Sequence, residues 1–105
     1  MSDIRNAMQI LKAISDKDYG FMKFLFEQNK RKYIDLDKLP HFRSINDLAM
    51  ISIYEKNYNA AKYFIEQGAD LYFISQETTK IEPPNFEAIK FINDIVYEKT
   101  KHIDF

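Results

Sequence analysis

Apolar residues recur along the chain at the spacing of α-helices. Between Asp3 and about Asp16 they fall every third or fourth position, on one side of a helix: Ile4, Ala7, Met8, Leu11 and Ile14. The pattern predicts a second helix over residues 19–28, for which Asp18 is a suitable N-cap. A third helix is predicted from an Asn46 cap to the break before Lys56, a fourth over residues 58–67 and a last over about 85–99.

Residues that end helices separate these segments. Gly68 follows the fourth helix and is expected at a positive φ, and Asn29 tolerates the same left-handed conformation after the second. Pro40 forbids one continuous helix through residues 30–45. Residues 71–84 are predicted to be irregular, with two prolines at their end. Because no segment alternates as a strand would, we predict an all-α fold of five helices.

The chain repeats itself after 39 residues. The shift superposes Ile14 on Ile53, Lys17 on Lys56, Tyr19 on Tyr58, Lys23 on Lys62, and Glu27 on Glu66. In a partial third copy, residues 85–92 match residues 57–64 by residue class. Repetition at this period predicts one domain, a helical solenoid of about two and a half helix-pair repeats. Repeat 1 covers about 3–45, repeat 2 about 46–84, and a C-terminal capping helix about 85–99.

The best copy, residues 46–72, resembles an ankyrin repeat. Residues 60–71 read AAKYFIEQGADL and are similar to the family's second helix and the turn after it. The resemblance implies that Ala69 packs beneath this turn and that Asp70 accepts backbone N–H bonds. Lys17 and Lys56 stand where the family has glycine, its Thr-Pro-Leu-His opening is absent, and the spacing exceeds the usual period of about 33. We therefore expect a short, degenerate ankyrin-like array.

Composition excludes several classes of protein. The 105 residues suit one domain, and 46% hydrophobic and 15% aromatic residues are too many for a disordered chain. Fifteen Lys and Arg balance sixteen Asp and Glu, so the net charge of -1 offers no field for nucleic acid or an anionic membrane. Without cysteine there are no disulfides or thiolate metal sites. No apolar run has the roughly 20 residues of a membrane span, and we expect a cytoplasmic protein.

Catalytic residues are scarce. His41 and His102 form no metal-binding spacing, and no glycine-rich loop could hold a phosphate. Asp35 and Asp37 are expected to form a turn rather than an acid–base pair. We therefore predict no enzymatic activity, no cofactor and no metal.

The connector over residues 30–45 is basic and contains aromatic residues. Its candidate partner-binding residues are Lys30, Arg31, Lys32, Tyr33, Phe42 and Arg43. One interpretation is a loop that binds an anion or nucleic acid, with Lys38 contributing. The other is a helix C-terminus whose dipole the cations neutralise. Because long loops on rigid scaffolds often carry function, we include the connector in the predicted binding surface.

Eight of the sixteen aromatic residues fall into two groups of four. Phe24, Phe26, Phe64 and Phe91 are predicted to lie in the core. Tyr54, Tyr72 and Phe73, with Phe42, fall at helix ends or connectors, where an ankyrin-like unit points side chains toward its concave face. Aromatic residues are enriched at protein interfaces, so these four are candidate contacts. The alternative is that they cover the open ends of a short array.

These observations predict a non-catalytic protein–protein interaction module. A small stand-alone binder of this kind acts by occluding or tethering one protein partner, as an inhibitor or immunity-type protein does. The alternative is a nucleic-acid-associated adaptor that uses the basic residues between 30 and 43. A short array also leaves apolar ends open, so a homodimer or a partner that completes the stack is a further hypothesis.

Overall fold

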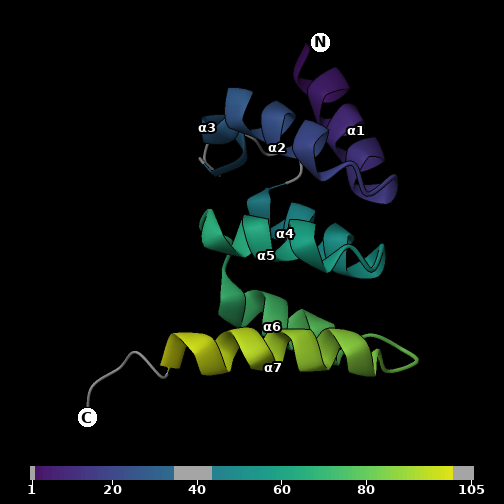
Figure 1. Cartoon of the computed structure of the whole chain (residues 1–105), viewed down its shortest axis with the longest axis vertical. Helices are drawn as coiled ribbons and strands as arrows, with labels where there is room; N and C mark the ends of the chain where they lie inside the picture. Colours follow the sequence, from purple (N-terminus) through teal and green to yellow (C-terminus); the bar gives the residue numbers. More distant parts are fainter. Residues whose placement is uncertain (1, 35–43, 101–105) are drawn as a thin grey trace.

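The computed structural model describes residues 2–34 and 44–100, which form helices and no strand (Figure 1). The helices are α1 (Ser2–Ser15), α2 (Tyr19–Gln28), α3 (Lys30–Ile34), α4 (Ile45–Tyr54), α5 (Tyr58–Glu66), α6 (Leu71–Thr79) and α7 (Phe86–Thr100). The all-α prediction is confirmed for this part of the chain. The prediction of five helices is wrong, because α3 and α6 lie in segments expected to be irregular.

The helices stack in pairs along the long axis of the molecule. Figure 1 shows α1 and α2 at the top, α4 and α5 in the middle, and α6 and α7 at the bottom. The first helices form one row, because α1 packs on α4 and α4 packs on α6. The second helices form another row, in which α2 packs on α5 and α5 meets α7 through one ring contact. The described chain is thus a stack of three helix pairs.

The turns inside the first two pairs have the same geometry. Lys17 and Lys56 adopt left-handed φ angles of 60° and 59°, the conformation that usually favours glycine. The Lys17 N–H donates to the Ile14 carbonyl (3.1 Å) and the Asp18 N–H to the Ala13 carbonyl (2.9 Å), which is a Schellman motif. The same two bonds recur 39 residues later, at 3.0 and 2.8 Å. The repeat read from the sequence is therefore present in the backbone.

Each second helix begins with a polar side chain that caps it. Asp18, Asn57 and Asn85 each accept the backbone N–H three residues ahead, at 3.3, 3.2 and 3.0 Å. Such caps satisfy an N–H group that has no partner within the helix. The cap of α2 was predicted correctly, and the three equivalent caps extend the repeat to the last pair.

The helix α6 corrects the predicted course of residues 71–84. Asp70 caps it by accepting the N–H groups of Tyr72 (3.0 Å) and Phe73 (3.2 Å), so the expected role of Asp70 as an acceptor is confirmed. Ile74 and Thr78 lie one turn apart and are fully buried. Because α6 pairs with α7, the last helix is not a lone cap but the second helix of a third pair.

Other helix ends differ in part from the predictions. Gly68 has a φ of 120° as expected, and Ala69 is buried beneath its turn. Asn29 ends α2 with a φ of -126°, outside the left-handed region. Ser44, not Asn46, caps α4, in a reciprocal pair of bonds with Asp47. The Asn46 side chain instead accepts the N–H of Asp70 at 2.7 Å and so joins the second pair to the third.

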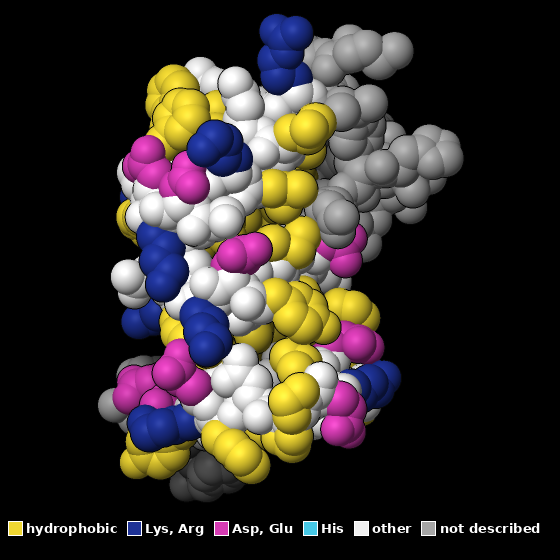
Figure 2. Space-filling view, turned by 90° about the vertical axis from the view of Figure 1, so that its right-hand side faces the viewer, with side chains coloured by type: hydrophobic (Ala, Val, Ile, Leu, Met, Phe, Trp, Pro, Cys, Tyr) yellow, Lys and Arg dark blue, Asp and Glu magenta, His cyan; other side chains and the backbone are white. Residues whose placement is uncertain are grey.

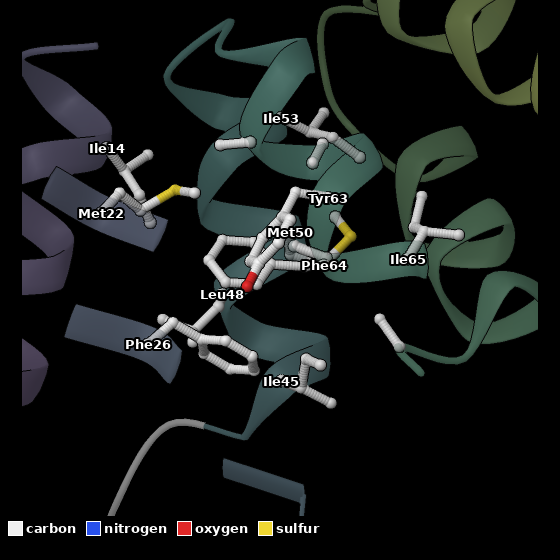
Figure 3. Packing of buried hydrophobic residues seen from close by; sticks show 14 of the residues in the cluster. Ile14, Met22, Phe26, Ile45, Leu48, Met50, Ile53, Tyr63, Phe64 and Ile65 are labelled. Atoms are coloured by element: carbon white, nitrogen blue, oxygen red, sulfur yellow. The ribbon is translucent and has the colours of Figure 1, made fainter. Parts of the chain in front are cut away.

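Aromatic rings fill the centre of the stack (Figure 3). Phe26 of α2 and Phe64 of α5 are fully buried. Their ring centroids lie 5.3 Å apart in an edge-to-face arrangement, and this contact joins the first helix pair to the second. Both predicted core positions are confirmed. Phe91 is only half-buried against the core. The prediction for Phe24 is wrong, because its side chain is 56% exposed on the first pair, where no earlier pair covers it.

Candidate functional site

The predicted basic residues lie at the end of the first pair. Lys30 and Arg31 begin α3, which follows α2 after a single residue. They line a hollow of about 350 Å³ whose other lining residues are Glu27, Gln28 and Asn29. The hollow thus contains a carboxylate beside its two cations.

The other candidate residues of the connector lie wholly or partly outside the residues that the structure describes. The backbone of Lys32 belongs to α3, but its side chain lies outside the described residues. Phe42 and Arg43 also lie outside them. Their predicted partner contacts therefore stay predictions.

Tyr33 is a core residue. Its side chain is 3% exposed, its ring stacks on Phe26 with 5.5 Å between centroids, and its hydroxyl donates to the Asn6 side-chain oxygen. Asn6 is also buried and donates to the Leu25 carbonyl at 3.5 Å. Tyr33 thus fixes α3 against the first pair. A partner could not reach it, so we remove it from the predicted binding surface.

The other predicted aromatic contacts do not form one surface. Tyr54 is 62% exposed in the last turn of α4, and Tyr72 is 72% exposed in the first turn of α6. Figure 1 shows that α4 ends at the side of the stack opposite to the start of α6. Phe73 is half-buried and packs against the core. The structure therefore separates the two exposed tyrosines and covers much of the phenylalanine.

A groove lies between α5 and α7 in the described part of the chain. It has a volume of about 510 Å³. The groove is lined by Lys62, Ile65, Glu66, Phe91, Asp94, Ile95, Glu98 and Lys99. The rings of Tyr58 and Phe91, 5.0 Å apart, hold the two helices together at one end. Since α7 has 15 residues and α5 only 9, α7 is longer by roughly 9 Å and part of it lacks a facing helix.

The groove has an apolar floor and a charged rim. Ile65 is 4% exposed, and Phe91 and Ile95 are half-buried one turn apart on α7. Three carboxylates and two ammonium groups surround this floor, and one of the carboxylates, Asp94, also pairs with Lys90 at 3.0 Å, so charges of both signs are balanced around the groove. Such an arrangement suits an apolar contact whose edges are fixed by charge pairs.

The groove between α5 and α7 was not predicted from the sequence. Phe91 was predicted to lie in the core, and Ile95 follows it four residues later, on the same helix. Both positions therefore indicated a buried contact rather than a partly open groove. The sequence alone did not show which element would face it.

A polar cluster joins α2 to α5 near the groove. The Tyr63 hydroxyl donates to the Glu27 carboxylate, and the Lys23 ammonium lies 5.8 Å from the centre of the Tyr63 ring. Burial raises the pKa of Tyr63 well above its ordinary value, and the bond to Glu27 raises it further. The phenol therefore stays protonated at neutral pH and holds the first two pairs together as a hydrogen-bond donor.

The described residues contain neither a cluster of metal ligands nor a helix suited to span a membrane. Residues 2–34 and 44–100 contain no group of three or more His, Cys, Asp or Glu side chains that could hold a metal ion. His41 and His102 lie outside these ranges. Among the helices from α1 to α7, none combines the length and the apolar character that a membrane span requires.

Known proteins provide no template for this site. Comparisons of the chain with protein-family models, with curated proteins and with solved structures found no match. The interpretation of the groove therefore depends on its own geometry and chemistry.

Proposed function

We propose that this protein is a non-catalytic interaction module that binds one protein partner in the α5/α7 groove. The observation that supports this function best is the apolar floor of Ile65, Phe91 and Ile95 inside a charged rim. Exposed apolar surface rimmed by polar groups is typical of protein-binding sites. A partner would bury the half-exposed Phe91 and Ile95 side chains, and this burial would supply the main favourable free energy.

The occupant that fits the groove is an amphipathic helix of the partner. Apolar side chains at a spacing of three or four residues on such a helix would contact Phe91 and Ile95, which have the same spacing on α7. Basic residues beside this stripe would face Glu66 at the rim.

The array itself is proposed to be a degenerate ankyrin type. The Schellman turns at Lys17 and Lys56 and the Gly68 turn support this classification. Only residues 67–70 separate α5 from α6, so no room exists there for the hairpin finger of a regular ankyrin array. A short array of this kind would act by occlusion, as an inhibitor or immunity-type protein does. A cytoplasmic location remains a proposal from the cysteine-free composition.

The alternative function, a nucleic-acid-associated adaptor, has weaker support. It would use Lys30, Arg31 and Lys32, and residues beyond the described ranges. Two of these cations share their hollow with Glu27, whose carboxylate would repel a phosphate. The adaptor predicts that binding falls steeply between low and moderate salt, because phosphate contacts release counterions.

Capture of partners by tagged variants tests the proposed function. Bait proteins would be wild type, Ile95→Glu in the groove, and a control with both Tyr54→Ala and Tyr72→Ala. We expect nuclease-treated lysate to yield one protein near stoichiometry with wild type and the control, and at least about tenfold less with Ile95→Glu. Equal recovery with Ile95→Glu, or loss with the tyrosine control, would contradict binding in the groove.

A second set of baits tests the adaptor. A variant with Lys30, Arg31 and Lys32 all changed to Ser should retain the partner if the groove binds it. Recovery that disappears after nuclease treatment or in this triple variant would favour the adaptor instead.

A further inference from the structure

Three aromatic residues occupy the same position on the second helices. Phe24 of α2, Tyr63 of α5 and Phe91 of α7 are related by the repeat shifts of 39 and 28 residues. Two of them contact the preceding pair. Tyr63 packs on α2 and Phe91 packs on α5. We call this position the knob.

The surface that receives each knob is also repeated. Tyr63 meets the Tyr19 ring edge-on at 6.0 Å, lies 5.8 Å from the Lys23 ammonium and donates to the Glu27 carboxylate. An aromatic residue, a lysine and an acidic residue, each four positions apart, thus form a socket on one side of the helix.

The next socket uses equivalent residues. The Phe91 ring lies 5.0 Å from Tyr58, and Phe91 lines the groove together with Lys62 and Glu66. The aromatic ring contact is therefore repeated at both junctions between the second helices, and the equivalent lysine and acidic residue line the groove beside the second one.

A third socket lies on α7 at the end of the stack. It consists of Phe86, Lys90 and Asp94, which are the repeat equivalents of Tyr58, Lys62 and Glu66. The Phe86 side chain is 76% exposed, and Lys90 and Asp94 form an exposed ion pair at 3.0 Å. No helix pair of the described chain follows α7, so nothing in residues 2–34 and 44–100 fills this socket.

The opposite end of the stack presents a knob without a socket. Phe24 is 56% exposed on α2, and Phe21 beside it is 46% exposed. Figure 2 shows hydrophobic side chains both at the upper end, over the first pair, and at the lower end, over the last pair. The two ends are thus the complementary halves of a contact that the chain already makes twice internally.

We propose that this protein associates head to tail with a second copy of itself. Phe24 of one copy inserts against Phe86, Lys90 and Asp94 of the next, and the stack of helix pairs continues across the junction. Phe21 on one side and Tyr97, which is 67% exposed, on the other add apolar area to the contact. Because such an interface joins two different surfaces, it leaves a free knob and a free socket and permits further growth into a row.

Sedimentation velocity over about 5 to 500 µM, a range that spans weak association, tests this arrangement. We expect the mass of wild type to rise with concentration, while Phe24→Ser and Phe86→Ser each stay monomeric. An equimolar mixture of the two variants should form a dimer that grows no further, because one retains the socket and the other the knob. Circular dichroism should show wild-type helicity for both, since the substituted side chains are exposed.

Two controls keep the test specific. Tyr54→Ser removes an exposed aromatic residue away from both ends and should associate as wild type does. Ile95→Glu should also leave association unchanged, since the proposed contact does not use the groove floor. A monomeric wild type throughout the range, or a mixture of the two end variants that stays monomeric, would overturn the proposal. Association of Phe24→Ser or Phe86→Ser alone at the wild-type level would do the same.

Discussion

The side-chain amide of Asn57 donates a hydrogen bond of 3.0 Å to the backbone carbonyl of Ile14, in the preceding helix pair. The same side chain caps α5 through its oxygen, which accepts the Ala60 N–H at 3.2 Å. Its repeat equivalent, Asp18, caps α2 in the same way, but no bond from its side chain to another pair of the described helices is present. A carboxylate can form this cap, whereas the additional bond of Asn57 requires the N–H of an amide.

This double role predicts a graded loss of stability at position 57. Asn57→Ala should lower the free energy of unfolding by about 2 kcal/mol, because it removes both the cap and the side-chain hydrogen bond to the Ile14 carbonyl, which then keeps only the Lys17 N–H as a donor. Asn57→Asp keeps an oxygen for the cap and should lose about 1 kcal/mol. Urea denaturation followed by circular dichroism measures both.

Position 18 supplies the control for this comparison. Asp18→Ala removes only a cap and should cost about 1 kcal/mol, and Asp18→Asn should be close to neutral. Equal stability of Asn57→Asp and wild type would mean that the bond to Ile14 contributes nothing.

The positive φ angles of Lys17 and Lys56 predict that glycine at either position would stabilise the fold. Lys17→Gly and Lys56→Gly should each raise the free energy of unfolding by about 1 kcal/mol, because glycine adopts a φ near 60° without the steric cost that a Cβ imposes. Lys62→Gly, in the middle of α5, should instead lower it by about 1 kcal/mol. Thermal and urea unfolding of the three variants would decide; a loss of stability in either turn variant would refute the predicted gain.

Two tyrosines of α5 form a matched pair. Tyr63→Phe removes a hydroxyl that donates to a carboxylate and should destabilise the chain by about 2 kcal/mol. The Tyr58 hydroxyl is buried and makes no hydrogen bond of ordinary geometry among the described residues, although Glu87 and Asn85 lie close to it, so Tyr58→Phe should destabilise the chain less than Tyr63→Phe. Chemical denaturation of both variants measures the difference, and equal losses would show that the bond to Glu27 has no special role.

The raised pKa of Tyr63 predicts a loss of stability in alkali. The unfolded chain releases the phenolic proton near pH 10, whereas the folded chain holds it to a higher pH, so stability falls as pH rises above about 10. Burial also raises the pKa of Tyr58, in the same direction. Urea midpoints at pH 8 and about 11 should therefore fall less in Tyr63→Phe than in wild type; an identical fall in both would contradict this.

The sequence predicted the features that local spacing determines. The 39-residue shift identified the equivalent turns at Lys17 and Lys56, and Gly68 identified the next turn. The sequence repeat could not show which of the equivalent aromatic side chains would be covered by another helix pair. Phe24 and Tyr63 are equivalent in the repeat, yet only Tyr63 has a pair above it.

The helix α6 was not predicted from the sequence, because its residues have a low helix propensity. Residues 71–79 read LYFISQETT, in which aromatic, β-branched and serine residues are common. The helix is instead stabilised by the Asp70 cap and by burial of Ile74 and Thr78. Tertiary packing also forms the groove, since the two helices that line it, α5 and α7, are separated in the sequence by α6.

Site-specific photo-crosslinking tests partner binding in the groove most directly. A photoreactive amino acid would replace Glu98 at the rim of the groove in one variant and Tyr54, at the end of α4, in the other. After irradiation in the presence of partner-containing lysate, we predict a covalent adduct with one protein from position 98, and its loss when Ile95→Glu is added. An adduct from position 54 alone would contradict the assignment of the groove as the binding site.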